Sequence, residues 1–161
     1  MKLLILALFT VLSLTACGKD RCIGQTFNGN NNAGLIGTFT PSRSDAKWVI
    51  GTITLTNVGT KPIQFTALQA GNTYPGFKIS FPGAPEVSAV QDVRVNPWIG
   101  TVTVVNGAQI SELPVGANVS LPMKWSVLGK PAKNSSFTVR VTGMASEGKA
   151  IPDLLITNPG M

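Results

Sequence analysis

The sequence predicts an all-β protein made of short antiparallel strands. Apolar and polar residues alternate in successive runs, turn-forming pairs such as Asn106-Gly107 separate these runs, and no helical stripe longer than two turns follows residue 35. A parallel α/β sheet needs crossover helices of about ten residues or more, and none fits here. With 161 residues, of which 43% are hydrophobic, the chain is long enough for one domain with its own core.

The first segment, residues 1–16, has the pattern of a signal peptide. A positive start at Lys2 precedes an uncharged apolar run from Leu3 to Leu14. As a helix this run would reach about 18 Å, which is short of the ~30 Å hydrocarbon core of a membrane. We therefore expect a cleaved signal segment and not a spanning helix. The alternative is a buried N-terminal helix with an incidental cysteine.

The residues Leu14-Thr15-Ala16-Cys17 resemble the lipobox of bacterial lipoproteins. The resemblance implies cleavage before Cys17, a diacylglyceryl thioether on its sulfur and a further acyl chain, such as palmitate, on its amino group. Two or three acyl chains make a lasting anchor. Gly18 stands where proteobacterial lipoproteins kept at the inner membrane tend to have Asp, so the resemblance favours the outer membrane.

The next segment, residues 17–35, is rich in Asn and Gly and shows no apolar period. We expect a flexible tether with a root-mean-square reach of roughly 20–25 Å. The alternative for its Asn run is a patch that binds a glycan or a peptide. Cys22 has no internal partner once Cys17 carries lipid, so we expect a free thiol, with an intermolecular disulfide as the alternative.

Residues 36–161 are expected to form the β domain. In the run Trp48–Asn57, Val49 and Ile53 share one face, and threonines occupy the other face, which suits a solvated antiparallel strand. Pro122 places its strand at an edge or a bulge. Asn106-Gly107 predicts a tight hairpin between 101–105 and the following run. The further expected strands are Pro62–Leu68, Phe77–Phe81, Val87–Val95, Thr101–Val105, Val119–Val127, Ser136–Thr142 and Ala150–Ile156.

Two short patterns in this domain resemble those of bacterial immunoglobulin-like domains. Residues 53–59 followed by Lys61-Pro62-Ile63 are similar to their T-N-x-G hairpin, and residues 113–119 are similar to the entry into their next core strand. The resemblance implies an immunoglobulin-like β-sandwich. The disulfide and the tyrosine corner of antibody domains are absent from this sequence.

The composition argues against most enzymes. The chain has no His, which removes His-dependent hydrolysis and His-ligated metals, and two Cys cannot build a four-Cys metal site. Its seven acidic residues are scattered, and Ser-x-x-Lys, Gly-x-Ser-x-Gly and Gly-x-Gly-x-x-Gly motifs are absent. We therefore expect no catalytic residue, no cofactor and no metal.

The net charge of +6 comes from basic residues that stand singly along the chain. Without basic runs or an aromatic ladder we expect no nucleic-acid partner. The charge suits solubility and a weak attraction to anionic lipid or polysaccharide.

Three residues are candidate partner contacts. Trp98 and Ile99 follow Asn96-Pro97 in an expected loop, and Tyr74 lies in a stretch rich in turn residues. Exposed aromatic residues often anchor partners, although burial under a loop is the competing interpretation for all three. Trp125, in contrast, shares an apolar strand face with Leu121 and is expected in the core.

Together these patterns predict a membrane-anchored lipoprotein of the cell envelope that acts as a non-enzymatic binding or assembly module. Its expected partners are the membrane, through the lipid on Cys17, and another envelope protein or a polysaccharide. We expect it at the outer membrane, facing the periplasm or the surface. The alternatives are a structural subunit of a secretion, conjugation or pilus machine and a carbohydrate-active enzyme.

Overall fold

A computed structural model describes residues 24–31, 33–44, 47–65, 73–90, 101–105, 108–127 and 136–159. In these ranges the chain forms strands and turns and no helix. The strands are β1 (Phe27–Asn30), β2 (Leu35–Ser44), β3 (Trp48–Asn57), β4 (Ile63–Phe65), β5 (Thr73–Ser80), β6 (Val87–Val90), β7 (Thr101–Val105), β8 (Ala108–Leu113), β9 (Asn118–Ser126), β10 (Phe137–Val141), β11 (Met144–Ser146), β12 (Lys149–Ala150) and β13 (Leu154–Asn158).

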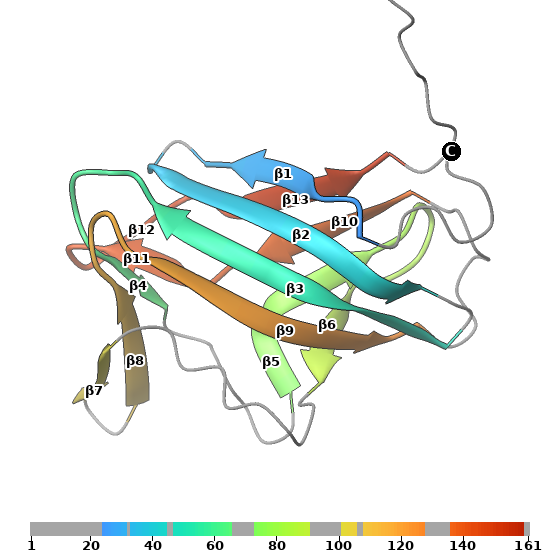
Figure 1. The fold of residues 1–161 in the computed structure, drawn as a ribbon. Coiled ribbons are helices and arrows are strands. Elements are labelled where there is room, and N and C mark those ends of the chain that lie inside the picture. The colour runs from blue at the N-terminus through green and yellow to red at the C-terminus, as the bar shows by residue number, and fades with distance from the viewer. Residues whose placement is uncertain are drawn as a thin grey trace, which may run out of the picture.

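The strands make two antiparallel sheets. The larger has the order β1-β2-β3-β9-β6-β5-β10-β13, and the smaller has the order β12-β11-β4-β8-β7. The larger sheet curls until it is nearly barrel-shaped, with β1-β2-β3-β9 as a front layer and β6-β5-β10-β13 as a back layer (Figure 1). The predicted all-β antiparallel fold is thus confirmed, and a single curled sheet supplies both layers of its main body.

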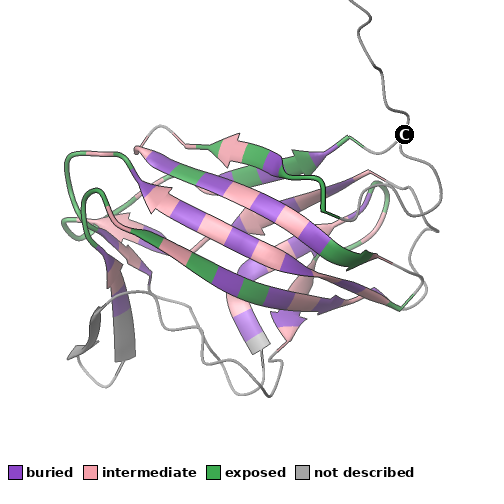
Figure 2. Ribbon diagram, viewed as in Figure 1, coloured by how far each residue is buried: buried purple, intermediate pink, exposed green. Residues whose placement is uncertain are grey.

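The two layers enclose one core, because inward positions alternate with outward ones along each strand (Figure 2). Trp125 of β9 is fully buried, as predicted. Its ring meets Phe39 of β2 edge-on, with centroids 5.5 Å apart, and its Nε1–H donates to the carbonyl oxygen of Phe77 in β5 at 3.3 Å. One side chain therefore joins the front layer to the back layer.

Several predicted strands agree with the structure. The bounds of β3 and β7 are those expected, and β9 and β10 differ from expectation by a residue at their ends. Residues 101–105 and 108–113 pair as a hairpin whose last pair is Val105 with Ala108, as Asn106-Gly107 predicted. At Pro122 the ladder described for β9 has β3 on one side, while β6 joins β9 through the single pair Val90 and Lys124. β9 nevertheless lies between β3 and β6 in the strand order, and its ladder with β3 has no register shift, so the edge or bulge predicted for Pro122 is wrong.

The expected tether needs correction, because two strands begin inside residues 17–35. β1 occupies Phe27–Asn30 and pairs with β2, which starts at Leu35, and Phe27 is part of the core. Asn31 organises the turn between them: its Oδ1 accepts from the amides of Ala33 and Leu35. Of the predicted tether, residues 17–23 lie outside the described part of the chain.

The glycines of this region serve a close approach between strands. Gly29 of β1 lies opposite Gly37 of β2, and both face β13. A Cβ at Gly29 would lie 2.0 Å from the carbonyl oxygen of Leu155, and one at Gly37 would lie 2.4 Å from Leu154 Cδ2. The barrel closes at this seam because no side chain stands in the way.

The T-N-x-G segment predicted as a hairpin instead connects the two sheets, because β3 pairs with β2 and β9 whereas β4 pairs with β8 and β11. Asn57 ends β3 and is fully buried. Its Nδ2 donates to the carbonyl oxygens of Lys61 (2.9 Å) and Leu113 (3.0 Å), and its Oδ1 accepts from the amide of Gly59 (3.0 Å). Since Leu113 belongs to β8, this one amide group links the last residue of β3 to the smaller sheet.

Candidate binding surface

Of the predicted contact residues, Tyr74 is the one that the structure describes. Its side chain is 3% exposed and belongs to the core, so it does not form a contact surface. The hydroxyl group is buried without a hydrogen-bond partner among the described residues, and burial raises the pKa of Tyr74. Cys17, Cys22, Trp98 and Ile99 lie outside the described residues.

The described ranges contain neither a cluster of metal-ligating side chains nor a membrane-spanning helix. Within them, no three or more Cys, Asp or Glu side chains gather where they could hold a metal ion. Over the same ranges, no helix is long and apolar enough to cross a membrane. Polar side chains that could bind a partner lie on the outer surfaces of the barrel.

The front layer carries a regular array of hydroxyl groups on its outer side. We call this array the hydroxyl face; its residues are Thr38, Thr40, Thr52, Thr54, Thr56 and Ser120. The strand register aligns them in rows, because Thr38 pairs with Thr54, Thr54 with Ser120, and Thr40 with Thr52. In such a sheet, neighbouring rows are about 6.8 Å apart and neighbouring strands about 4.8 Å apart.

Hydrogen bonds between strands hold some of these hydroxyl groups in place. Thr54 Oγ1 and Ser120 Oγ are 2.8 Å apart, and Thr40 Oγ1 is 2.9 Å from Thr26 Oγ1 in the segment before β1. A hydroxyl group donates one hydrogen bond and accepts two. Each paired group therefore keeps capacity for a bound molecule.

The strands of the front layer hold two charged residues, Arg43 and Lys124, and no acidic one. Both cations lie toward the end of the layer where β3 begins, and the Lys124 ammonium is 4.1 Å from the centre of the Trp48 ring. Amide side chains border the array, with Asn28 and Asn30 exposed on β1 and Asn118 exposed at the start of β9. The centre of the front layer is therefore uncharged, and it also includes two exposed apolar residues, Ile36 beside Thr56 and Pro122 beside Thr52.

The back layer has a different outer surface. Arg140 of β10 pairs across the strands with Lys78 of β5, and both cations reach Glu86. The Arg140 Nη2–Glu86 Oε2 distance is 2.5 Å, and Lys78 Nζ lies 3.7 Å from the same oxygen. Arg140 Nη1 is also 3.6 Å from Asp153 Oδ2. We call these four residues the ion-pair cluster.

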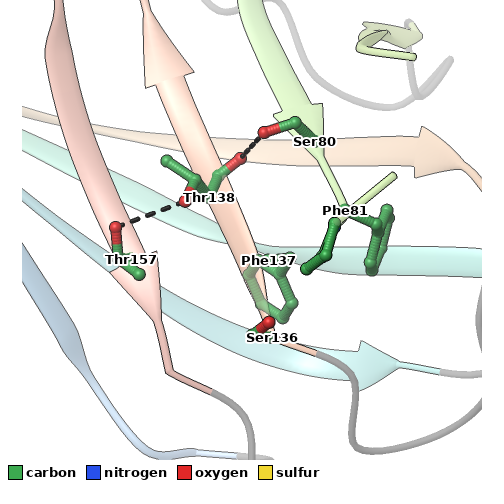
Figure 3. A pocket seen from close by; sticks show the side chains of 7 residues that line it. Ser80, Phe81, Ser136, Phe137, Thr138 and Thr157 are labelled. Carbon is green, nitrogen blue, oxygen red and sulfur yellow. Dashed lines mark hydrogen bonds between the residues drawn. The ribbon is translucent and has the colours of Figure 1, made fainter. Parts of the chain in front are cut away.

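A hollow of about 250 Å³ opens beside the ion-pair cluster. Figure 3 shows Ser80, Thr138 and Thr157 in line across three strands, with Phe81 and Phe137 below them. Ser80 Oγ donates to the Thr138 carbonyl oxygen at 3.5 Å, and the hydroxyl oxygens of Thr138 and Thr157 are 3.3 Å apart. The hollow is lined by four hydroxyl side chains, those of Ser80, Ser136, Thr138 and Thr157, and the hydroxyl face has six, so the hollow is the smaller polar site.

A second hollow, of about 430 Å³, lies at the end of the barrel where β3 stops. It is lined by Gly34, Gly59, Lys61 and Ser146, among others, and the Lys61 ammonium pairs with Glu147 at 2.5 Å. Both partners are more than half exposed. Such an exposed pair is well hydrated and gives this hollow little capacity to select a ligand.

The sequence showed one part of the hydroxyl face, the alternating threonines of Trp48–Asn57, as a solvated strand side. Thr38 and Thr40 have the same spacing, but the expected tether and the inward Gly37 and Pro41 obscured β2. The rows themselves depend on the register between β2, β3 and β9, which joins residues far apart in the chain.

Comparison with known proteins gives a likeness of fold. No protein-family model matches the chain, and no curated protein matches it. Among solved structures, a candidate lipoprotein of Bacillus subtilis subsp. subtilis str. 168, ycdA, aligns with a TM-score of 0.51 at 12% identity, over 82% of this chain and 38% of ycdA. The yjhA protein of Bacillus subtilis aligns with a TM-score of 0.46 at 17% identity, over 75% of this chain and 79% of yjhA.

This chain therefore spans well under half the length of ycdA. At 12% identity the likeness concerns the fold alone. The protein has an all-β fold similar to part of a candidate lipoprotein.

Proposed function

We propose that this protein is a lipid-anchored lipoprotein of the cell envelope that holds a rigid, non-enzymatic binding module close to the membrane. The lipobox-like residues Leu14-Thr15-Ala16-Cys17 and the fold likeness to a candidate lipoprotein support the anchor. The immunoglobulin-like relationship and the outer-membrane location belong to the same proposal. They rest on the sequence pattern around Asn57 and on Gly18.

The observation that carries the proposal is where the described chain becomes fixed. The amide of Gly24 donates to the carbonyl oxygen of Pro41 at 2.9 Å, so the chain joins the barrel about seven residues after Cys17. A fully extended segment of that length spans at most about 25 Å. A lipid on Cys17 would therefore keep the barrel next to the membrane surface.

The anchor would also orient the binding surface. The chain joins the barrel at Gly24, next to Pro41, which pairs with Gly51 near the start of β3, while Asn57 lies at the other end of β3. A strand of ten residues, such as β3, is about 33 Å long. The hydroxyl face runs along these strands and would extend outward from the membrane, where an envelope partner can reach it.

Replacement of Cys17 tests the anchor. In the Cys17→Ser variant we expect no incorporation of a labelled fatty acid and retention of residues 1–16, because a serine hydroxyl is too weak a nucleophile to take the lipid. Labelling of the purified protein and its intact mass measure both effects. Cys22→Ser is the matched control and should be labelled and cleaved like the unchanged protein.

If Cys17→Ser is still cleaved before residue 17 and still carries lipid, the anchor assignment is wrong.

Size-exclusion chromatography in mild detergent distinguishes a reversible binding module from a structural subunit. A monomer supports reversible binding, whereas a stable large complex supports a permanent structural subunit.

A further inference from the structure

The front layer carries basic and apolar side chains next to one another where β3 begins. Ile50 of β3 pairs with Arg43 of β2 on one side and with Lys124 of β9 on the other, so the three residues form one row across the layer. Trp48 stands two residues before Ile50 on the same outer side of β3, and the Lys124 ammonium lies 4.1 Å from the centre of its ring. We call Arg43, Trp48, Ile50 and Lys124 the basic aromatic patch.

The turn beside this patch adds a further cation. Lys47 precedes Trp48 and is exposed. Its carbonyl oxygen accepts from the amide of Val127, just after β9, at 2.8 Å, and this hydrogen bond holds the residue against the front layer. Asp45 stands in the same turn in the sequence and lies outside the described residues. Even when Asp45 is counted, the patch and this turn carry an excess of positive charge.

The patch lies where the chain from the anchor reaches the barrel. The amide of Gly24 donates to the carbonyl oxygen of Pro41, two residues before Arg43 in the same strand. Figure 1 shows β2 ending and β3 beginning at this same end of the front layer. Since the segment from Cys17 to Gly24 spans at most about 25 Å, a lipid on Cys17 would keep the patch close to the membrane surface at all times.

The side chains of the patch suit the interface between lipid and water. Tryptophan is favoured at the level of the lipid headgroups, because its ring is amphipathic. Arginine and lysine attract the phosphates of anionic lipids while their apolar stems stay on neighbouring apolar groups such as Trp48 and Ile50. A nucleic acid would need contacts from more cations than the patch contains. An acidic protein would also attract the cations, but the anchor brings the membrane to this corner of the barrel.

We propose that the basic aromatic patch docks on the surface of a membrane that contains anionic phospholipids. The inference rests on the proposed function, because the lipid on Cys17 brings the patch to the membrane. It deepens that function by giving the anchored barrel one orientation. The corner where β2 ends and β3 begins lies on the headgroups, and the end of β3 that holds Asn57 points away from them.

Fluorescence quenching on vesicles tests the inference with the full, lipid-carrying chain. The probes are vesicles of phosphatidylcholine alone and vesicles of phosphatidylcholine and phosphatidylglycerol in equal parts, each containing a lipid with a spin label on its headgroup. We expect tryptophan fluorescence to be quenched more strongly on the anionic vesicles. Trp48→Phe should remove this additional quenching, since Trp125 is buried in the core. At 1 M NaCl the Debye length is about 3 Å, so the additional quenching should disappear while the protein stays anchored.

The double variant Arg43→Gln, Lys124→Gln removes two cations of the patch. The ratio of docked to undocked protein on anionic vesicles should then fall by at least about tenfold. The matched control is the double variant Lys61→Gln, Lys149→Gln, which removes two cations at the opposite end of the barrel. It should be quenched like the unchanged protein. Thermal unfolding of each variant shows whether a loss of quenching reflects docking or folding.

Equal quenching on neutral and anionic vesicles would overturn the inference. A folded Arg43→Gln, Lys124→Gln variant that is quenched like the unchanged protein would overturn it too. An equal loss in the control variant would mean that net charge, rather than the patch, brings the barrel to the membrane. If Trp48 stays unquenched on vesicles but is shielded from a soluble quencher by added polyglutamate, the patch serves an acidic protein instead.

Flotation with the neutral vesicles reports on the anchor separately. A protein that does not float with them but is quenched on anionic vesicles contradicts the anchor alone. A protein that floats with both kinds of vesicle without additional quenching on the anionic ones contradicts the docking alone.

Discussion

The front and back layers of the barrel are both antiparallel strands packed on one core, but their outer surfaces carry different side chains. In the front layer, the residues opposite the core are mainly threonines and serines in register. In the back layer, the outward Lys78 and Arg140 form the ion-pair cluster with Glu86 and Asp153, which lie just before β6 and β13. Burial of every second residue thus requires apolar inward side chains but does not determine which side chains face outward.

The first prediction concerns the core that the two layers share. Trp125→Ala removes the ring that packs on Phe39 of the front layer and donates to Phe77 of the back layer. We expect the free energy of unfolding to fall by about 3–5 kcal/mol, measured by urea denaturation.

Trp48→Ala is the control for that measurement, because Trp48 lies on the outer side of β3 and is partly exposed. It should cost no more than about 1 kcal/mol. If the two variants lose similar stability, Trp125 does not join the layers as described.

The second prediction concerns the ion pairs on the outer surface of the back layer. Arg140→Met keeps the apolar stem but removes the cation from Glu86 and Asp153, which are about one-third exposed. We expect a loss of about 1 kcal/mol at low salt. At 1 M NaCl the Debye length is about 3 Å, so the loss should shrink.

Thr54→Val on the front layer is the matched substitution. Its effect on stability should stay within about 0.5 kcal/mol and should not depend on salt. A salt-independent loss for Arg140→Met would mean that packing, rather than charge, is the contribution of Arg140.

The third and smallest effect concerns Tyr74, on β5 of the back layer. Its hydroxyl group is buried without a partner in the described structure, so Tyr74→Phe should leave stability unchanged or raise it by up to about 1 kcal/mol. Burial raises the pKa of Tyr74 in the folded state. Stability should therefore be complete below about pH 10, the ordinary tyrosine pKa, and should decline as pH rises above it.

Phenolate absorbance measures this titration directly, because Tyr74 is the only tyrosine in the chain. The folded protein should ionise at higher pH than the urea-unfolded one, and Tyr74→Phe should weaken the alkaline loss of stability. Ionisation of the folded protein at the ordinary pKa would show that the ring is accessible to water.

Tyr74 also shows why some predictions from sequence could not be decided. Its neighbours Asn72, Pro75 and Gly76 are turn formers, which suggested an exposed ring. In the structure Tyr74 lies within β5, opposite Ala89 of β6. Its ring joins the core because β5 pairs with β6 and β10 within the curled sheet, and local composition does not encode that pairing.

The glycines of β1 and β2 give a second example. Asn- and Gly-rich sequence suggested a flexible tether, since these residues favour turns and coil. Gly29 and Gly37 are instead the positions at which β13 approaches the first two strands. A glycine selected for lack of a side chain looks the same in sequence as one selected for flexibility.

By itself the sequence determined the all-β class, the position of strands such as Trp48–Asn57 and the burial of Trp125, because alternation along a strand is local. Tertiary structure alone decided that one sheet curls into a near-barrel, that Gly29 meets Leu155, and that threonines from β2 and β3 and Ser120 of β9 form one surface. The reason is physical: a residue's inward or outward position follows from its own strand, whereas its neighbour across the ladder comes from a distant segment and is fixed only when the strands pair.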